Sequence, residues 1–527
     1  MWICAALLNS NQSSAMKHIL TLLLVSSLSV LAFTACQNPA CKKYITYEQF
    51  GAKGDGVTDD MPAIVAAHQA ANEKGLPVKA KSGKTYYIGK TPVYAEIRTD
   101  TDFGKASFII DDVDFDLKNK DKPVFLVLPD KEAFEVEGVN SLKRGQTNLG
   151  VSLPCRCLVE VVNQEHKVFI RKGKNQNNGT AQKEVLLVGE DGNIDPSTPV
   201  VFDYDTVTTI KAYPIDEPIA IKGGTFSTIA NQAESRYNYH NRGITVRRSG
   251  TRIEGLTHRI TGELDHGAPY TGFIYLEHVA DVVVSDCLMT GHKTYITDYS
   301  SGGGPVSMGS YDLNANSCAH ILWKDCRQTN DIDDKAYWGV YTTNFCKDLQ
   351  LDNCVFSRFD AHQSATNVQL KNSTFGHQSV RMVGFGTFLI ENCEMHGKYL
   401  LSLRDDYGST WDGDIILRNC IMRPYEGDKM ACIIGGSNNG SHDFGYECRL
   451  PHNIKVEGLL IDDSAITRED YAGPTVLSSF GRKTGAEEPF PFLTDCCVTL
   501  SGVTVKSGKP LAPAPNPEAF PGLVVNR

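Results

Sequence analysis

Short stretches of alternating apolar and polar residues recur along most of the chain, and they end in the same way. Each contains two alternating apolar residues, a polar residue, then Asn, Asp or Gly, and then a small residue that is usually Cys. A period of two indicates strands, and the Asn, Asp or Gly indicates the turn that ends each strand. The copies lie at 219–224, 282–287, 321–326, 349–354, 368–373, 388–393 and 415–420, with looser copies at 253–256, 454–459 and 498–503.

The spacing between these copies predicts how the strands are arranged. Most copies follow one another at 19 to 44 residues, which is typical of a solenoid built from stacked coils. The closest copies end at Cys354, Ser373 and Cys393, so these coils leave the least room for loops. We therefore expect their side chains to be in register.

A different pattern comes before the repeats. Apolar residues at helical spacing follow Thr58 and Asp59, either of which is a suitable N-cap, and the stretch ends at Gly75, a suitable C-cap. This pattern predicts a helix over 59–74. Its position before the first repeats would place it at the open end of the solenoid.

The residues around this helix resemble a known superfamily. The phrase F-G-A-K-G-D-G-V-T-D-D at 50–60, a helix, and then Y-Y-I at 86–88 resemble the N-terminal cap of pectate-lyase-like proteins. The resemblance implies an all-β fold, a right-handed parallel β-helix with an N-terminal capping helix. Polysaccharide lyases, polygalacturonase-like hydrolases and phage tailspikes share that fold, so the fold alone does not define the reaction.

The repeats also divide the chain. We expect the cap and first coils at 36–105, a β-rich insertion at 106–215 where the pattern is lost, the main β-helix at 216–507 and a Pro-rich tail at 508–527.

The first 35 residues have the features of an export signal. A basic tip at Met16 to His18 precedes a short apolar run, so Met1–Ala15 is interpreted as an over-extended start. Phe33-Thr34-Ala35-Cys36 resembles a bacterial lipobox with Phe33 in place of Leu, which predicts lipidation at Cys36; the alternative is ordinary cleavage near Ala35. We expect a lipoprotein at the outer membrane or cell surface of a Gram-negative bacterium, or a periplasmic protein, which meets the membrane only through its lipid.

Composition narrows the classes of partner and the role of the cysteines. The 527 residues carry a net charge of −10, which argues against a nucleic-acid partner. Of the 16 cysteines, five occupy one repeat position that Ser373 fills once. We interpret these five as a ladder of buried thiols rather than as disulfides or metal ligands: Cys287, Cys326, Cys354, Cys393 and Cys420.

Counting from the repeat markers suggests a site. His362 lies eight residues after Cys354, and Arg381 lies eight residues after Ser373, so we expect them to stack on one face. Neighbouring coils should add catalytic Tyr341, Lys335 and Arg404, with Arg358, His377 and Trp338 as substrate contacts.

These residue types suit β-elimination on a uronic-acid polymer. The reaction needs the uronate carboxylate neutralised, a base for the C5 proton and an acid for the leaving oxygen. We assign His362 as base with Lys335 as the next choice, Tyr341 as acid, and Arg381 and Arg404 as carboxylate clamps.

An Arg-rich stretch supports an anionic partner. Residues 236–259 contain six Arg and one acidic residue, Glu254, so this stretch has a charge of +5. We expect substrate contacts from Arg248 of this stretch and, in the loops that follow, from His266, Tyr270 and His292. A sulfated glycosaminoglycan of the chondroitin or hyaluronan type ranks slightly above pectin as the substrate.

Two other functions fit the sequence. Asp331, Asp333 and Asp334, together with Asp360 or with Asp405 and Asp406, could supply the paired carboxylates of a polygalacturonase-like glycoside hydrolase, although the later G-H-G and R-I-K motifs of that family are missing. The same aspartates could instead hold Ca²⁺, the one cofactor we expect. The third candidate is a non-catalytic glycan-binding β-helix lipoprotein that stacks sugars on aromatic residues such as Trp338.

Overall fold

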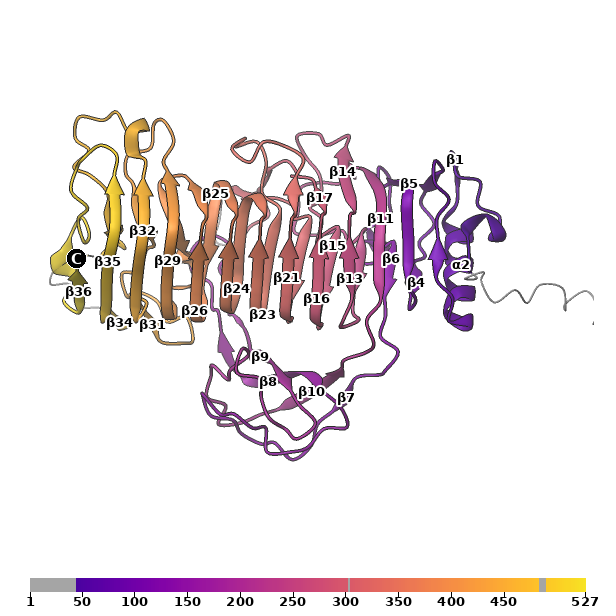
Figure 1. The fold of residues 1–527 in the computed structure, drawn as a ribbon, viewed down its shortest axis with the longest axis horizontal. Coiled ribbons are helices and arrows are strands. Elements are labelled where there is room, and N and C mark those ends of the chain that lie inside the picture. Colours follow the sequence, from indigo (N-terminus) through magenta and orange to yellow (C-terminus); the bar gives the residue numbers. More distant parts are fainter. Residues whose placement is uncertain (1–43, 302–303, 483–489) are drawn as a thin grey trace, which may run out of the picture. The chain divides into compact units, whose positions relative to one another are not determined.

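The computed structural model describes residues 44–301, 304–482 and 490–527, and Ile45–Arg527 form one compact unit. Within the described residues, twenty-eight strands pair into one continuous sheet that winds through successive coils (Figure 1). The signal peptide, the over-extended start and the lipidation site at Cys36 lie outside the described residues. Within those residues, no helix is both long and apolar enough to cross a membrane.

The coils stack their strands in three parallel ladders. The first ladder contains β4 (Ala95–Ile97), β6 (Phe125–Val127), β12 (Ile244–Val246), β15 (Ile274–Glu277), β20 (Leu313–Asn316), β23 (Tyr341–Asp352), β24 (Val355–Lys371), β25 (Thr374–Met382), β28 (Tyr399–Leu403), β30 (Cys432–Gly435) and β33 (Thr475–Leu477).

The second ladder uses other segments of the long strands β23 and β24. It adds β2 (Val78–Lys79), β5 (Thr101–Asp111), β11 (Ala220–Ile229), β13 (Arg252–Glu254), β16 (Ala280–Ser285), β21 (Ala319–Lys324), β26 (Gly384–Glu391), β29 (Trp411–Arg423), β32 (Asn453–Ile461), β35 (Cys496–Val505) and β36 (Leu523–Asn526).

The third ladder shares several of those strands after a turn. It adds β1 (Asp55–Asp59), β3 (Thr85–Ile88), β14 (Thr257–Thr261), β17 (Leu288–Met289), β22 (Arg327–Gln328) and β27 (Glu394–His396).

The repeat marker is explained by the turn between the second and third ladders. The Asn or Asp of the marker has a left-handed backbone with φ near 50°, a conformation that these two residue types tolerate better than most. Such residues are Asp286, Asp325, Asn353, Asn372, Asn392 and Asn419. The following small residue then points into the core.

That small residue forms the predicted thiol ladder. Cys287, Cys326, Cys354, Cys393 and Cys420 are buried, and every cysteine that the structure describes is free. The amide of Cys354 donates to Ser373 Oγ at 2.9 Å, which places the serine next in the ladder. One hydrophobic cluster contains these thiols and continues from Ile45 to Phe520.

The N-terminal coils pack against helix α2 (Met61–Lys74), which starts two residues later than expected. Its buried face, formed by Met61, Ile64, Ala67, His68 and Ala71, joins the same core. Gly75 ends the helix with φ of 62°. The helix therefore shares its apolar contacts with the first coils.

A four-stranded antiparallel sheet forms a lobe beside the coils (Figure 1), with β7 (Phe134–Glu135), β8 (Cys157–Val168), β9 (Thr180–Val188) and β10 (Thr209–Pro214). The expected insertion boundary at 106 is too early, because β5 and β6 still belong to the solenoid. The lobe is held to successive coils by Arg156–Asp281 (2.5 Å), His278–Glu160 (3.2 Å), Lys347–Glu184, Asn367–Ser197 (2.8 Å) and Arg144–Asp412 (2.5 Å).

The remaining elements are short. They are the pairs β18 (Tyr295–Thr297) with β19 (Val306–Met308) and β31 (Cys448–Arg449) with β34 (Phe492–Leu493), and the 3-10 helices η1 (Tyr47–Phe50), η2 (Leu117–Asn119), η3 (Asp405–Tyr407), η4 (Asp463–Ala465) and η5 (Pro517–Ala519). The Pro-rich tail contains β36, which pairs with β35.

Candidate functional site

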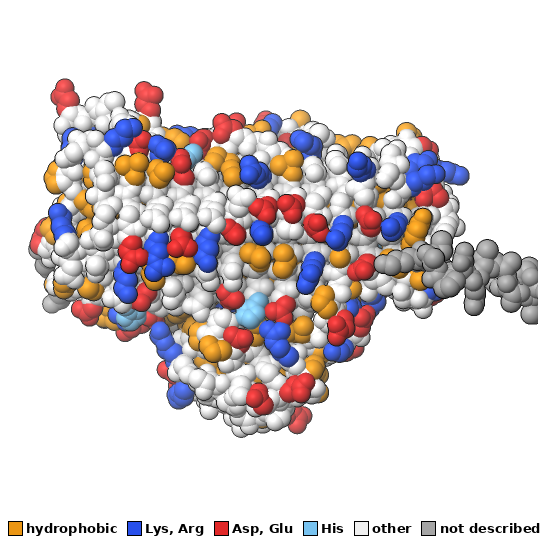
Figure 2. All heavy atoms as spheres, viewed as in Figure 1, with side chains coloured by type: hydrophobic (Ala, Val, Ile, Leu, Met, Phe, Trp, Pro, Cys, Tyr) orange, Lys and Arg blue, Asp and Glu red, His pale blue; other side chains and the backbone are white. Residues whose placement is uncertain are grey.

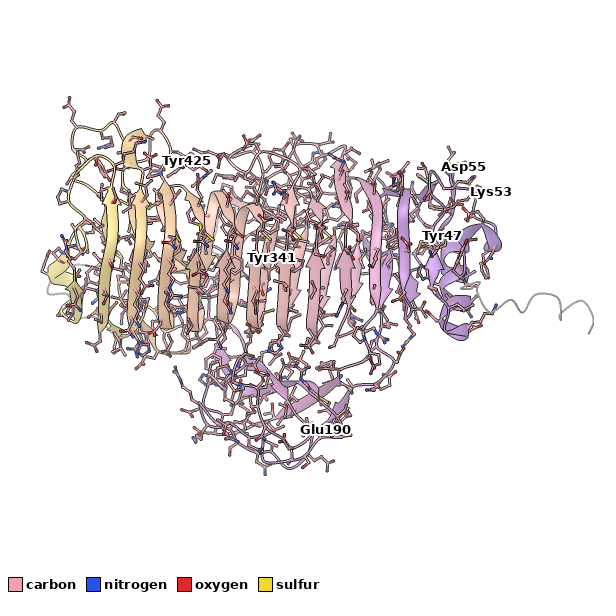
Figure 3. The ribbon with its side chains drawn as sticks, viewed as in Figure 1. Tyr47, Lys53, Asp55, Glu190, Tyr341 and Tyr425 are labelled. Carbon is pink, nitrogen blue, oxygen red and sulfur yellow. The ribbon has the colours of Figure 1, made fainter. Side chains whose placement is uncertain are left out.

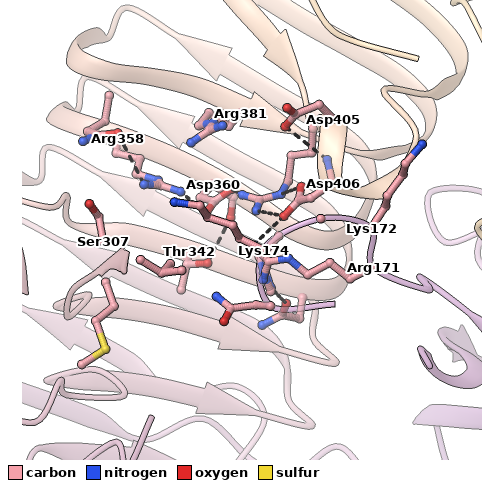
Figure 4. Close-up of a pocket in the computed structure, with 18 of the residues that line it drawn as sticks. Arg171, Lys172, Lys174, Ser307, Thr342, Arg358, Asp360, Arg381, Asp405 and Asp406 are labelled. Carbon is pink, nitrogen blue, oxygen red and sulfur yellow. Dashed lines mark hydrogen bonds and ion pairs between the residues drawn. The ribbon is translucent and has the colours of Figure 1, made fainter. Parts of the chain in front are cut away.

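A cavity of about 1120 Å³ lies over the first ladder. Its lining comes from segments of the coils between β11 and β31, and from the loop that joins β8 to β9 in the lobe (Figure 4). We call this loop, residues 169–179, the hairpin tip. Segments far apart in the sequence therefore build one concave surface.

The first ladder has one polar and one apolar row at adjacent positions. Asn314, Thr342, Asp360, Arg381 and Ser402 pair consecutively at one register position. We call these the outward row, and all but Ser402 line the cavity. The residues just before them, Leu313, Tyr341, Phe359, Val380 and Leu401, form the inward row and are buried in the core. Neighbouring strands lie about 4.8 Å apart, so the outward row is a closely spaced column.

Asp360 is the centre of this column. Its carboxylate contacts the Arg358 and Arg404 guanidiniums at 2.5 Å each and accepts a hydrogen bond from the Tyr311 hydroxyl at 2.9 Å. Burial alone would raise the pKa of Asp360, but the two guanidiniums hold the pKa well below its usual range. Asp360 is therefore ionised, and its oxygens hold the two arginines in place.

A second carboxylate is used in the same way. Asp406 accepts from Arg404 Nη2 at 2.8 Å and from Arg171 Nη2 at 2.8 Å. Burial opposes ionisation of Asp406, yet Arg404 and Arg171 lower its pKa. Two of the three cavity carboxylates are thus committed to arginines.

Arg381 differs from the other arginines of the cavity. Among the described residues, its guanidinium has no hydrogen bond or ion pair, and Figure 4 shows it apart from the bonded network. Burial and the nearby Arg358 and Arg404 lower the pKa of Arg381, so its charged form is disfavoured by its surroundings. An arginine remains charged even so, and a desolvated cation without a partner favours binding of an anion.

His362 lies near these cations and is half-buried. Its Nδ1 is 3.3 Å from Asn344 Oδ1, and its Nε2 is 3.4 Å from the Tyr407 hydroxyl. Burial, followed by the charge of Arg404, lowers the pKa of His362 to about 3. The imidazole is therefore neutral at pH 7 and can accept a proton.

The expected register of His362 and Arg381 was wrong by two residues. Phe356 pairs with Phe375, but Arg358 pairs with Ser379, so β25 contains two extra residues at this point. Gly376 enters the bulge, where a Cβ would lie 2.1 Å from the Ile332 carbonyl oxygen. Asp360 consequently lies beside Arg381, while His362 still lines the cavity.

Two of the predicted catalytic residues are placed elsewhere. Tyr341 lies on β23 (Figure 3) in the inward row; it is fully buried, and its hydroxyl has no hydrogen-bond partner among the described residues, so it cannot act on a substrate as the expected acid. Lys335 is exposed and does not line the cavity; its Nζ is 5.4 Å from the centre of the Tyr425 ring. Successive residues of a strand point to opposite faces, so an error of one position placed Tyr341 on the outward face instead of the inward face.

Arg404, Arg358 and Trp338 do line the cavity, and the Arg358 guanidinium carbon is 4.7 Å from the centre of the Trp338 ring. His377 does not, because the two-residue bulge directs it toward the 332 loop, where its amide donates to the Ile332 carbonyl at 3.1 Å. The expected substrate contact by His377 is therefore wrong.

The other expected substrate contacts also lie away from the cavity. Tyr270 is buried, and its hydroxyl accepts from the Asn231 amide at 2.9 Å. His266 is exposed and pairs with Asp265 at 2.8 Å. Arg248 is buried against Asp130 at 2.8 Å, and His292 is buried against Asp312 at 2.9 Å. These side chains satisfy local hydrogen bonds and ion pairs instead of facing a ligand.

The charge of the Arg-rich stretch is largely neutralised within the fold. Arg236 pairs with Glu234, Arg242 with Asp112 and Arg247 with Glu277, each at 2.8 Å, in addition to the Arg248 pair. Figure 2 likewise shows acidic and basic side chains interspersed on the face in view. The excess of positive charge lies in the cavity, where six cationic side chains face three carboxylates.

The aspartates proposed for Ca²⁺ do not converge. Asp333 accepts from His396 Nδ1 at 2.9 Å and from the Tyr425 hydroxyl, while Asp331 and Asp334 accept from backbone amides of their own turn at 3.0 and 2.9 Å. They therefore do not form the expected site.

Within the described parts of the chain, one group has the spacing of metal ligands: His258, His292 and Asp312. Asp312 accepts from His258 Nδ1 at 2.8 Å, from His292 Nε2 at 2.9 Å and from the Thr290 amide at 2.8 Å. These direct bonds account for the grouping without an ion.

The hairpin tip was missed at the sequence level. Arg171, Lys172 and Lys174 line the cavity from the lobe, more than 100 residues before most of the other lining residues. The run R-K-G-K at 171–174 is basic, and that was the available signal. Nothing in the repeat pattern connects it with the coils it meets.

Solved tailspike proteins have a similar fold. The tailspike gp61 of Pseudomonas phage phi297 is 12% identical, with a TM-score of 0.53 and coverage of 92% of this chain and 83% of that chain. The tailspike gp49 of Pseudomonas phage LKA1 is 14% identical, with a TM-score of 0.51 and coverage of 91% and 84%. No family model and no curated protein matches the chain. At these identities the likeness confirms the β-helix fold alone, and membership of the pectate-lyase-like branch stays a prediction.

Proposed function

We propose that this protein binds an acidic polysaccharide in the cavity and cleaves it by β-elimination at a uronic acid. The observation that carries the proposal is the half-buried guanidinium of Arg381, which has no ion-pair partner among the described residues and lines the same cavity as the neutral imidazole of His362. A uronate carboxylate on Arg381 would provide the missing partner, since arginine binds carboxylates through two parallel hydrogen bonds.

The reaction divides among residues already in place. Arg381, supported by Arg358, stabilises the negative charge that develops on the uronate when its C5 proton leaves. His362 takes that proton, a C4–C5 double bond forms, and the C4–O bond breaks. Binding of the carboxylate also raises the pKa of His362, because an anion near the imidazole favours its protonated form.

The acid that protonates the leaving oxygen must be a different tyrosine from Tyr341. Tyr311 lines the cavity, and its hydroxyl donates to Asp360. Burial raises the pKa of Tyr311 to about 12, so the group carries its proton at neutral pH. We assign Tyr311 to this role.

A glycoside hydrolase is the second candidate, and the carboxylates argue against it. A hydrolase needs one carboxylic acid that stays protonated, which requires a raised pKa. Asp360 and Asp406 have lowered pKa values because arginines surround them. The proposed lyase reaction needs no carboxylic acid with a raised pKa, so the residues of the cavity suit it better.

The finer parts of the proposal concern substrate and location. The surplus of cations favours a densely charged glycosaminoglycan slightly above pectin. Export and a lipid anchor at Cys36 would place the protein where such polymers are met, with the lipid as its one membrane contact.

The test is an assay on chondroitin, hyaluronan and pectic polymers that follows the ultraviolet absorbance of unsaturated uronate products. We expect new absorbance from the unmodified protein, and a loss of about 100-fold or more in Arg381→Ala and His362→Ala. Arg418→Ala is the matched control, because this partly exposed arginine does not line the cavity and pairs with Glu457 at 2.7 Å.

The outcomes separate the three functions. Reducing ends without absorbance would indicate a hydrolase. Retention without cleavage would indicate a binding protein. Full activity in both cavity variants would show that the site lies elsewhere.

A further inference from the structure

We infer that the hairpin tip supplies a second anion-binding subsite, so that the substrate presents at least two anionic groups to the cavity at once. The inference rests on the proposed function and specifies how densely its substrate is charged. Arg381 would hold one uronate, and the ammonium groups of Lys172, near Ser441, and Lys174, near Pro305, would each be available to a neighbouring carboxylate or sulfate.

The tip is fixed at its base. Phe169 packs its ring against Phe345, Tyr407 and Tyr446, with centroid distances of 5.6, 6.0 and 5.0 Å. The amide of Lys172 then donates to the Asp406 carbonyl at 3.2 Å. The backbone that carries the lysines is therefore attached to the same coil as Arg404.

The far end of the tip is fixed to earlier coils. The Asn175 amide donates to the Ser301 carbonyl at 2.8 Å, and Asn175 Nδ2 donates to the Tyr237 hydroxyl at 2.6 Å. The tip thus connects loops on both sides of the outward row and forms part of the cavity wall. Such anchoring reduces the entropy that a bound ligand would otherwise have to remove.

The two lysines lack the partners that the nearby arginine has. Arg171 is paired with Asp406, but Lys172 Nζ donates to the neutral Ser441 hydroxyl, and Lys174 Nζ donates to the Pro305 carbonyl at 2.9 Å. No carboxylate of the described residues lies within ion-pair distance of either ammonium group. With Arg381, these are the three cationic side chains of the cavity without a carboxylate partner.

This arrangement predicts which polymers bind tightly. Lysine binds carboxylate and sulfate as a point charge and does not require one planar geometry. A chain with a single carboxylate per disaccharide would use Arg381 fully and the tip only in part. A chain that carries a sulfate beside each uronate would engage both subsites.

The experiment compares two probes of equal length by isothermal titration calorimetry, a hyaluronan hexasaccharide and a chondroitin sulfate hexasaccharide. His362→Ala serves as the background, so that neither probe is cleaved. In this background we expect the sulfated probe to bind more tightly. Adding the double change Lys172→Ala, Lys174→Ala should lower the affinity for the sulfated probe about fivefold, and it should lower the affinity for hyaluronan less.

The matched control is Lys105→Ala, Lys455→Ala, which removes two exposed lysines that do not line the cavity. Equal affinity of the tip variant and the control for the sulfated probe would overturn the second subsite. If Arg381→Ala still weakens both probes in that case, the proposed function stands. If Arg381→Ala leaves both probes unaffected, the proposed function itself fails.

Discussion

The outward and inward rows of the first ladder occupy adjacent positions on the same strands, yet they differ in almost every property. The inward row is buried and apolar apart from one unpaired hydroxyl, and its members are interchangeable in kind. In the outward row, a carboxylate at Asp360 is followed on the next coil by a guanidinium at Arg381. Because stacking of the coils restricts the choice of residue only on the inward face, the outward face can hold binding and catalytic side chains.

The largest expected effect comes from neutralising Asp360 in the outward row. Asp360→Asn leaves Arg358 and Arg404 buried without their shared counter-charge, and we expect the free energy of unfolding to fall by about 3–5 kcal/mol. Urea unfolding at pH 7 measures the effect. Asp405→Asn is the control, because Asp405 is exposed. Equal midpoints for the two variants would contradict the central role of Asp360.

A second test concerns the buried His292 and the pH dependence of the free energy of unfolding. Burial lowers the pKa of His292, but Asp312 and Glu263 outweigh burial and raise this pKa to about 9. A group with a raised pKa stabilises the fold fully below its unfolded value of about 6.5, and this contribution is lost as the pH rises through about 9.

We therefore expect unfolding free energy to decline by about 2–3 kcal/mol between pH 6.5 and pH 9.5, and His292→Gln to flatten that decline. Urea midpoints across this range provide the measurement, with His266→Gln as an exposed control. A decline of the same size in His292→Gln would assign the pH dependence to other groups.

The smallest expected effect concerns Tyr341, the inward-row residue that carries a hydroxyl. Tyr341→Phe removes a buried hydroxyl that has no hydrogen-bond partner among the described residues, so we expect the free energy of unfolding to change by less than about 0.5 kcal/mol or to rise slightly. Cleavage or binding of the polymer should stay unchanged. A large loss of activity without a loss of stability would return Tyr341 to the list of functional residues.

Much of the fold could be predicted because it depends on repetition. Marker residues such as Asn353 and Asn372 must adopt a left-handed backbone, and the residue after each must fit the core, so both requirements leave a visible pattern. The tail was the exception at the C-terminal end. Its β36 forms by pairing with β35, a contact that its Pro-rich composition does not reveal.

The site was only partly predictable. Counting from the markers found His362, Arg381 and Arg404 in the cavity, because short coils preserve approximate register. It could not reveal the two-residue bulge before Ser379, which changes which residues are neighbours. Nor could it find Lys172, because the contact between the lobe and the coils is a matter of tertiary packing.

The lobe also changes how the solenoid responds to stress. In a simple stack, each coil touches only its neighbours, so an end can unravel while the middle stays folded. Here ion pairs and hydrogen bonds from one lobe reach coils from Asp281 to Asp412. These links join non-adjacent coils, so the central coils that carry the cavity should unfold as one cooperative block while the two ends fray independently.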